Sequence, residues 1–305
     1  MNTEVATINT ENFASMAKAM GLPTLSNDKK TNLLNRFRLW HETILGSEKV
    51  LVNGGSYRLE VVGEPSTFYF AKKVKFRPFL QRFMYKRWTP NPNKNRKEGE
   101  KKGTYHNSIL ADTLNIDLKD DAGTFNCGKH AGFVKDFQSL PEETRNAIKA
   151  VDRYRVVFGT VELIEPIKAI DGSIVKDLPV YPVLWEVKNN TDYKALGNVF
   201  SKFSKMERLP LQHNINLGEA EGQKSSNGST YYTSNINLDL TSKIEINEED
   251  HKMFGDFLDW VKSHNDGIVA KWDEKVAEKQ GTISGDDAKT VEQFIDVELE
   301  TNEKQ

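Results

Sequence analysis

The stretch Phe68–Tyr105 reads FYFAKKVKFRPFLQRFMYKRWTPNPNKNRKEGEKKGTY and is the most strongly patterned part of this 305-residue chain. From Lys72 onward it holds twelve Lys and Arg but only two acids, Glu98 and Glu100, which is a net charge of +10. The whole chain has a formal net charge of −2. Because a nearly neutral protein does not need such a patch, the concentration of positive charge predicts a negatively charged partner.

The same stretch predicts a sheet. Aromatic and β-branched residues dominate Phe68–Val74 and Phe79–Trp88, which indicates two strands. Pro78 between them predicts a bend or an edge position, because proline has no N–H to give to a neighbouring strand. Thr89–Gly103 contains prolines, asparagines and many lysines, so we expect a mobile loop there. Apolar residues alternate again in Tyr105–Leu118, which predicts a further strand.

Elements beyond this stretch suggest how the sheet is built. Proline and two acids open a short helix at Ser139–Ala150. Arg153–Ile164 and Val180–Val187 predict two more strands. Strands in this order, with a helix before the fourth, are typical of the oligonucleotide-binding (OB) barrel. We therefore expect an α+β fold with an OB-like antiparallel β-barrel core, to which helices and a hairpin are added.

Helical spacing divides the rest of the chain into segments. Residues 1–50 predict an N-terminal helical segment, with helices near Phe13–Met20 and over Asn27–Gly46. Residues 51–245 form the OB-like β core, with an inserted helix from Asp192 and a hairpin of Leu209–Leu217 with Thr230–Leu240. Residues 246–280 predict a C-terminal helical segment capped by Asn247, with a break near Gly267.

The basic stretch is the candidate binding surface. Single-stranded nucleic acid requires cations along its phosphates and rings against its bases. The candidate contacts are Lys72, Lys73, Lys75, Arg77, Arg82, Tyr85, Lys86, Arg87, Trp88, Lys94, Arg96, Lys97, Lys101, Lys102 and Tyr105. Alternation along a strand leaves a second interpretation open, in which rings such as Phe70, Phe76 and Phe83 fill a core and the lysines face water.

Residues 281–305 predict a disordered acidic tail, because seven acids and two lysines give this segment a net charge of −5. Such a tail can compete with nucleic acid for a basic groove. It can also bind replication or recombination proteins, and Phe294 with Ile295 would give such a partner apolar side chains to hold. A plain disordered end is the alternative.

Two further patterns suggest chemistry. Asp177 with Glu186 and Lys188 fits the loose spacing of a metal-dependent nuclease, in which two carboxylates hold the ion. Cys127 and His130 supply only two of the four ligands that zinc normally takes, so we expect no metal there. Neither of the two glycine-rich motifs that bind nucleotide phosphates is present, nor is the Gly-x-Ser-x-Gly motif of serine esterases. We expect that the protein binds no cofactor and is not an enzyme.

Composition points to a cytoplasmic protein. The first twenty residues have no apolar core typical of a signal peptide, and no window of eighteen residues is apolar enough to span a membrane. A single cysteine fits a reducing compartment.

The layout resembles that of phage-encoded single-stranded DNA-binding proteins. The resemblance is carried by a basic-aromatic β core (Phe68–Tyr105, Arg153–Leu163, Val180–Val187), then a helix, then an acidic tail at Asp286–Glu303. It implies an OB-fold coat of single-stranded DNA, acting in the host cytoplasm, whose tail recruits replication partners. Some members carry a zinc site made of Cys and His ligands, and this chain, whose single cysteine is Cys127, cannot form that site.

We therefore predict sequence-tolerant binding of single-stranded DNA in replication, recombination or repair. The metal-dependent nuclease and a viral structural or assembly protein are the alternatives.

Overall fold

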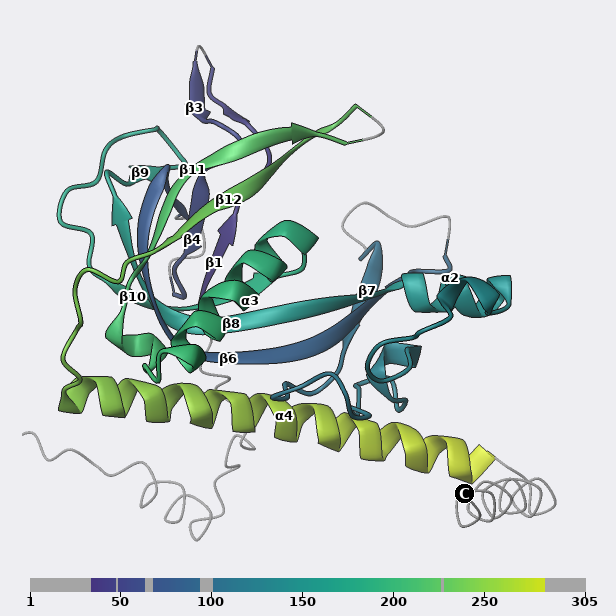
Figure 1. Ribbon diagram of the computed structural model, residues 1–305. Coiled ribbons are helices and arrows are strands. Elements are labelled where there is room, and N and C mark those ends of the chain that lie inside the picture. Colours follow the sequence, from purple (N-terminus) through teal and green to yellow (C-terminus); the bar gives the residue numbers. More distant parts are fainter. Residues whose placement is uncertain (1–33, 48, 64–67, 94–100, 226–227, 283–305) are drawn as a thin grey trace, which may run out of the picture. The chain divides into compact units, whose positions relative to one another are not determined.

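The computed structural model describes residues 34–47, 49–63, 68–93, 101–225 and 228–282 of the chain. Within these ranges the chain forms a ten-stranded sheet, a two-stranded sheet and three α-helices (Figure 1). The strands are β1 (Asn35–Leu39), β2 (Ile44–Leu45), β3 (Val50–Val52), β4 (Tyr57–Glu60), β5 (Phe68–Ala71), β6 (Lys73–Pro90), β7 (Gly103–Asn107), β8 (Val151–Ile164), β9 (Ile167–Lys168), β10 (Tyr181–Val187), β11 (Ile215–Lys224) and β12 (Thr230–Leu238). The helices are α2 (Glu142–Lys149), α3 (Asn190–Lys205) and α4 (Glu248–Thr282), with short 3-10 turns η1 (Asn126–Gly128), η2 (Phe137–Ser139) and η3 (Pro210–Gln212).

The large sheet is mainly antiparallel. Its strands follow the order β12-β11-β6-β8-β10-β1-β4-β5-β9, and β7 also pairs with β6. Only the β1–β10 pair is parallel within this described sheet. The predicted α+β class is therefore confirmed. The described strands form an open sheet, because no ladder joins β12 to β9, whereas a closed barrel was expected.

The sheet is curled, so that β12 approaches the end of β1. The Tyr232 N–H donates a hydrogen bond to Nδ1 of His41, 3.1 Å away, and the two rings stack with centroids 6.3 Å apart. Gly55 lies against the same tyrosine, and a Cβ there would come within 2.6 Å of its ring. Glycine suits this position for a second reason, since its φ is +85°.

β6 changes the face that its side chains present as it passes Pro78. Its pairing with β8 shifts register between Pro78 and Leu80, which is a β-bulge. Before the bulge, Val74 and Phe76 belong to the core under α3. After it, Leu80 and Met84 belong to the core under α4. The irregularity predicted at Pro78 is therefore a bulge within a strand. The predicted separation of Phe68–Val74 from Phe79–Trp88 is wrong, because β6 runs through Pro78 and the break between strands lies at Lys72.

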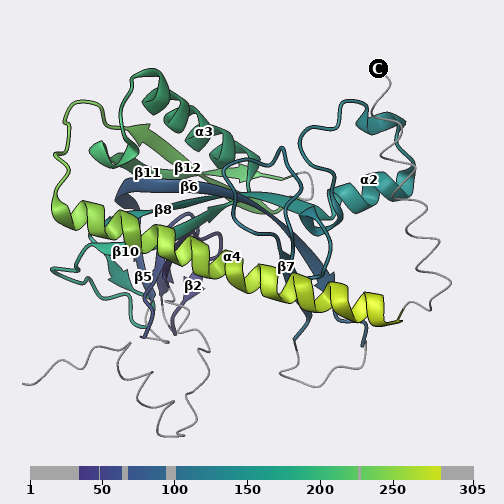
Figure 2. The same ribbon diagram turned by 90° about the horizontal axis from the view of Figure 1, so that it is seen from below.

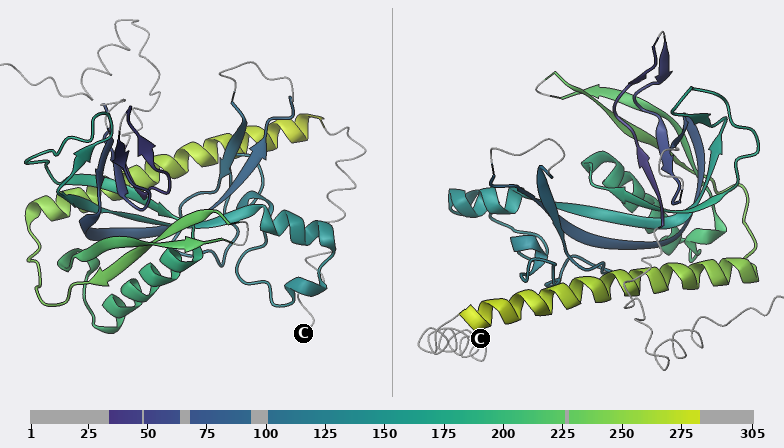
Figure 3. Two further views of the ribbon diagram at one scale, coloured as in Figure 1. Left: turned by 90° about the horizontal axis from the view of Figure 1, so that it is seen from above. Right: turned by 180° about the vertical axis from the view of Figure 1, so that it is seen from behind.

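Helices α3 and α4 cover opposite faces of the β6–β8 ribbon (Figure 1, Figure 2). α3 contributes Leu196 and Phe203 to a core that also contains Trp185. α4 contributes Phe257 and Val261 to the second core. From behind, α3 lies between the β11–β12 hairpin and the ribbon, and α4 lies on the ribbon's far side (Figure 3). Any ligand of the ribbon must therefore bind where neither helix covers it.

The predicted helix over Asn27–Gly46 is wrong where the structure describes it. Residues 35–39 form β1, in which Phe37 and Leu39 are buried while Arg36 and Arg38 are exposed. This is the period of two that a half-buried strand requires. The helix was predicted from apolar residues spaced three and four positions apart, whereas the buried residues within β1 are two positions apart. Pairing with β4 and β10 holds this segment as a strand. The first predicted helix, near residues 13–20, lies outside the described residues.

Other predicted elements are confirmed, with three differences. β8, β10, β12, α2 and α3 match the expected positions. The hairpin forms, but its first strand, predicted over Leu209–Leu217, begins only at Ile215 and continues to Lys224 as β11. The strand predicted over Tyr105–Leu118 ends at Asn107, where β7 stops. The break predicted near Gly267 is wrong, because α4 is continuous over 35 residues. The acidic tail lies outside the described residues.

One ion pair fastens α4 to the sheet. Nη1 and Nη2 of Arg77 donate to the two carboxylate oxygens of Asp250, at 2.7 and 2.8 Å. The Asp250 N–H also donates to Oδ1 of Asn247, while the Asn247 N–H donates back to the Asp250 carboxylate, which caps the helix reciprocally. Burial acts to raise the pKa of Asp250, but the hydrogen bonds from Arg77 and the Asn247 backbone outweigh it and hold the pKa below its ordinary value.

We predict that Asp250→Asn lowers the free energy of unfolding by about 3–5 kcal/mol at neutral pH, because it leaves the partly buried Arg77 charge uncompensated. Since the pKa of Asp250 is depressed by folding, its contribution is complete above the unfolded-state value of about 3.9 and is lost as the pH falls through the folded value. Urea unfolding at pH 7 and pH 3 measures this.

The control is Asp256→Asn, which removes an exposed pair with Lys252 on the same helix and should change stability little. Equal effects of the two variants at pH 7 would contradict the role given to Asp250.

Candidate nucleic-acid interface

The predicted contacts do not form one surface, because the bulge and the strand alternation divide them between the two faces of the β6–β8 ribbon. On the face covered by α4, several cations have acidic partners. Their nitrogen–oxygen distances are 2.7 Å for Arg77–Asp250, 2.9 Å for Arg82–Asp112, 2.6 Å for Lys86–Glu186 and 3.3 Å for the more exposed Lys75–Glu162. The structure thus compensates a large part of the positive charge that the sequence concentrates in β6.

The remaining predicted contacts lie at the two ends of β6. Lys72 and Lys73 are exposed beside the β5–β6 turn, and the Lys72 ammonium is 4.0 Å from Glu219. At the other end, Trp88 pairs with Tyr105 across the β6–β7 hairpin, with ring centroids 4.7 Å apart. Both rings are more than 40% exposed. Lys101 and Lys102 are exposed next to them, whereas Lys94, Arg96 and Lys97 lie outside the described residues.

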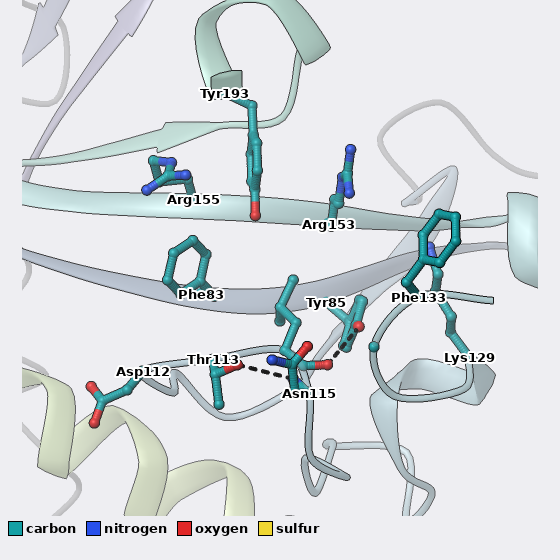
Figure 4. Close-up of a pocket in the computed structure, with 12 residues that line it drawn as sticks. Phe83, Tyr85, Asp112, Thr113, Asn115, Lys129, Phe133, Arg153, Arg155 and Tyr193 are labelled. Carbon is teal, nitrogen blue, oxygen red and sulfur yellow. Dashed lines mark hydrogen bonds between the residues drawn. The ribbon is translucent and has the colours of Figure 1, made fainter. Parts of the chain in front are cut away.

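A groove lies on the α3 side of the ribbon, with a cavity volume of about 320 Å³ (Figure 4). Three cations line it, Lys129, Arg153 and Arg155. Its aromatic residues are Phe83, Tyr85, Phe133 and Tyr193. We call these seven residues the basic groove.

Strand register explains how the groove is assembled. Phe83 of β6 lies directly opposite Arg155 of β8, and Tyr85 lies opposite Arg153. Opposite residues on neighbouring strands share a face, so both rings and both guanidiniums point to the same side. Tyr193 comes from the first turn of α3, which Asn189 caps by accepting the Asp192 N–H. Figure 4 shows its ring standing between the two arginines.

The segment after η1 forms the other wall of the groove. Lys129 and Phe133 come from it, and Phe133 is 87% exposed. The Lys129 ammonium lies 5.7 Å from the ring centre of Tyr85. Burial, and then the positive charge of Arg153, lowers the pKa of Lys129. Crowding of like charges in this way is the electrostatic condition under which a bound anion is stabilising.

Cations and rings alternate closely in the groove. Both Arg153 and Arg155 lie over the Tyr193 ring, at 5.0 and 4.7 Å from its centre, and Arg155 lies 4.9 Å from the centre of Phe83. Among the residues that the structure describes, no carboxylate oxygen lies within 4.0 Å of any of the three groove cations. Their charge is therefore available to a ligand, unlike that of Arg77 or Lys86.

Two of the predicted contacts belong to this side of the ribbon. Tyr85 lines the groove, but it is buried and its hydroxyl donates to the Leu114 carbonyl, so it forms a wall. Arg87 shares its face by strand alternation and extends the line of cations toward β7, exposed and next to Gly128.

The other groove residues were not among the contacts predicted from the sequence. Arg153 and Arg155 occupy alternate positions of β8, which places two cations on one face. This alternate spacing was the sequence signal that could have identified the two arginines as part of the groove. Nothing local to the sequence indicated that Lys129, Phe133 and Tyr193 would join them.

The nuclease residues are not assembled into a metal site. Glu186 is bound to Lys86, and the Lys188 ammonium lies 3.0 Å from Asp152. Asp177 sits in the connection before β10 with a φ of +56°. Within the described ranges, no group of three or more His, Cys, Asp and Glu side chains is arranged to hold a metal ion.

The thiol of Cys127 is not arranged as a nucleophile. Its side chain is buried, as expected for a small apolar residue. Burial, reinforced by Asp120 and Asp121, raises the pKa of the thiol to about 12. The reactive thiolate is therefore scarce at neutral pH.

Of the helices in the described part of the chain, none has both the length and the apolar character needed to cross a membrane. Comparison of the chain with protein-family models, curated proteins and solved structures found no match.

Proposed function

We propose that the basic groove binds single-stranded DNA in a sequence-tolerant manner, in replication, recombination or repair. The observation that carries this proposal is the set of groove cations without acidic partners, interleaved with aromatic rings. Cations hold the phosphate backbone and rings accept bases, and every base has a face that can stack. The bases of a duplex are already stacked on one another, so rings inside a groove favour an unpaired strand.

The proposal includes flanking contacts at the end of the ribbon. Arg87 continues the line of groove cations, and the exposed rings of Trp88 and Tyr105 offer a second place for bases. We leave Arg77, Arg82 and Lys86 out of the interface, because acidic side chains bind them.

We also propose that the curled sheet has an OB-type architecture. The sheet curls until β12 reaches the end of β1 through Tyr232 and His41. A curled antiparallel sheet with a groove on one side is the arrangement by which OB folds hold oligonucleotides.

Titration of a labelled single-stranded oligonucleotide at several salt concentrations tests the proposal. Binding should exceed that of a duplex and weaken steeply with salt, because each phosphate contact releases counterions. Lys129→Gln and Arg153→Gln should each weaken binding and reduce the slope of log affinity against log salt by about 0.7. Lys262→Gln is the control, since this lysine is paired with Asp266 on α4.

Binding that is absent, or equal for duplex and single strand, would contradict the proposal. So would equal losses in the groove variants and in Lys262→Gln.

Stacking predicts a separate effect of Phe133. Because its ring is almost fully exposed, Phe133→Ala should leave the melting temperature unchanged and weaken single-strand binding by roughly 1–3 kcal/mol. Trp88→Ala should show a loss of the same order if the flanking contact forms. Ile170→Ala, which removes another exposed apolar side chain that does not line the groove, is the matched control. Unchanged affinity in Phe133→Ala would remove that ring from the interface.

The acidic tail is proposed to dock replication or recombination partners. α4, which precedes the tail, contacts the connection between β7 and α2, where Nε1 of Trp272 donates to the Thr124 carbonyl and Nζ of Lys279 to that of Gly123. Deleting Gly285–Gln305 should therefore leave single-strand affinity unchanged or raise it, because acids that compete with DNA are removed. The same oligonucleotide titration measures this, and a large loss of affinity would contradict it.

A further inference from the structure

Arg155 is an unusual cation because it is buried without an acid. Its exposed fraction is 7%. One terminal nitrogen, Nη1, donates to the side-chain oxygen of Gln81, a neutral acceptor. Its Nε–H is enclosed and has no hydrogen-bond partner in the structure. A buried guanidinium is normally paired with a carboxylate, since an uncompensated charge in a low-dielectric site is strongly destabilising.

The surroundings of Arg155 hold its plane in place while leaving an edge unbonded. Phe83 and Tyr193 lie over the guanidinium carbon at 4.9 and 4.7 Å from their ring centres. The two rings are tilted by 51° to each other, with centres 6.3 Å apart, and they give the cation favourable contacts without accepting conventional hydrogen bonds from its N–H groups. With Gln81 on Nη1, neither Nε nor Nη2 has an acceptor. Because Nε is enclosed, Nη2 is the nitrogen that a ligand oxygen can reach, and a hydrogen bond from a guanidinium to an anionic oxygen is a strong one.

A glycine in α3 makes the room for this group. A Cβ on Gly197 would lie 2.9 Å from Nη2 of Arg155, so any larger residue would displace the guanidinium. Glycine inside a helix costs about 1 kcal/mol relative to alanine. Its presence here allows α3 to pass over the arginine without covering it with a side chain.

Two neighbouring cations add positive charge that a bound anion would neutralise. Arg153 lies on the other side of the Tyr193 ring, and Lys129 lines the same groove (Figure 4). Burial lowers the pKa of Arg155 because it removes water from the charged guanidinium. A bound anion would stabilise the charged form again. Asp112, at the groove's rim, is already bound to Arg82.

We propose that Arg155 is an oxyanion subsite that takes one phosphate oxygen at Nη2, with Arg153 and Lys129 supplying additional positive charge. As the anchor of a DNA strand, this subsite rests on the proposed function. As an anion site it does not, because a free phosphate offers the same oxygens. The phosphate therefore comes either from the backbone of a bound strand or from a free or terminal phosphate group.

The test observes the Nε–H group of Arg155 directly, by nitrogen-15 NMR of the full chain. The signal is assigned by its absence in Arg155→Gln. Three additions are compared, namely inorganic phosphate, an oligonucleotide without a terminal phosphate, and the same oligonucleotide with one. A saturable shift of the Nε–H signal with any of them supports the subsite. A shift with the unphosphorylated strand identifies the backbone as the source, and a shift only with the other two identifies a free or terminal phosphate.

Affinity measurements separate the subsite from the proposed function. Arg155→Gln should weaken oligonucleotide binding on the order of 10- to 100-fold, since bonds to a charged group are lost. Gly197→Ala retains the charge and should weaken binding by displacing it, whereas Gly255→Ala, at a helical position with open space, should not. Melting curves identify any variant that does not fold. If a variant does not fold, the titration of the Nε–H signal in the unaltered protein tests the subsite instead.

An Nε–H signal that none of the three additions shifts would overturn the subsite, even if Arg153→Gln still weakens strand binding and the proposed function stands. Conversely, a shift with inorganic phosphate in a protein that binds no oligonucleotide would support the subsite and contradict the proposed function.

Discussion

The ladder between β6 and β8 determines where the positive charge of this protein can act. It runs along most of both strands and shifts register at Pro78. Opposite the bulge, Gly159 has no side chain, and a Cβ there would collide with the Arg77 carbonyl oxygen. Because the bulge reverses which residues face each side, the cations that follow it are divided between a face covered by α4 and a face that opens into a groove.

Because of this division, cationic side chains have different roles on the two faces of the ribbon. On the α4 side, Arg77 and Lys86 are bound to acids, and they join elements distant in the sequence. On the α3 side, Arg153 and Arg155 lie among rings and have no carboxylate within reach in the described structure. Partnered charges stabilise the fold, whereas unpartnered and crowded ones favour a bound anion.

The sequence predicted elements with strong periodicity but not the faces they present. β8, β10 and α3 have clear patterns and lie where expected. The acid that binds Arg77 is 173 residues away and the one that binds Lys86 is 100 residues away, so no local pattern could identify these cations as structural. Residues 35–39 alternate as a strand requires, but the segment is short, and the strands that pair with it, β4 and β10, are not evident from the segment itself. The groove combines β6, β8, α3 and a loop, which no single segment could indicate.

The proposed function requires a single strand to lie on the groove face of the ribbon. Photochemical cross-linking of an oligonucleotide carrying halogenated pyrimidines, followed by mass spectrometry of the adducts, would locate the bound strand. We predict adducts on Phe133 and Tyr193, with flanking adducts allowed at Trp88 and Tyr105. Adducts confined to the α4 face of β6, with Phe133 and Tyr193 unmodified, would contradict the account.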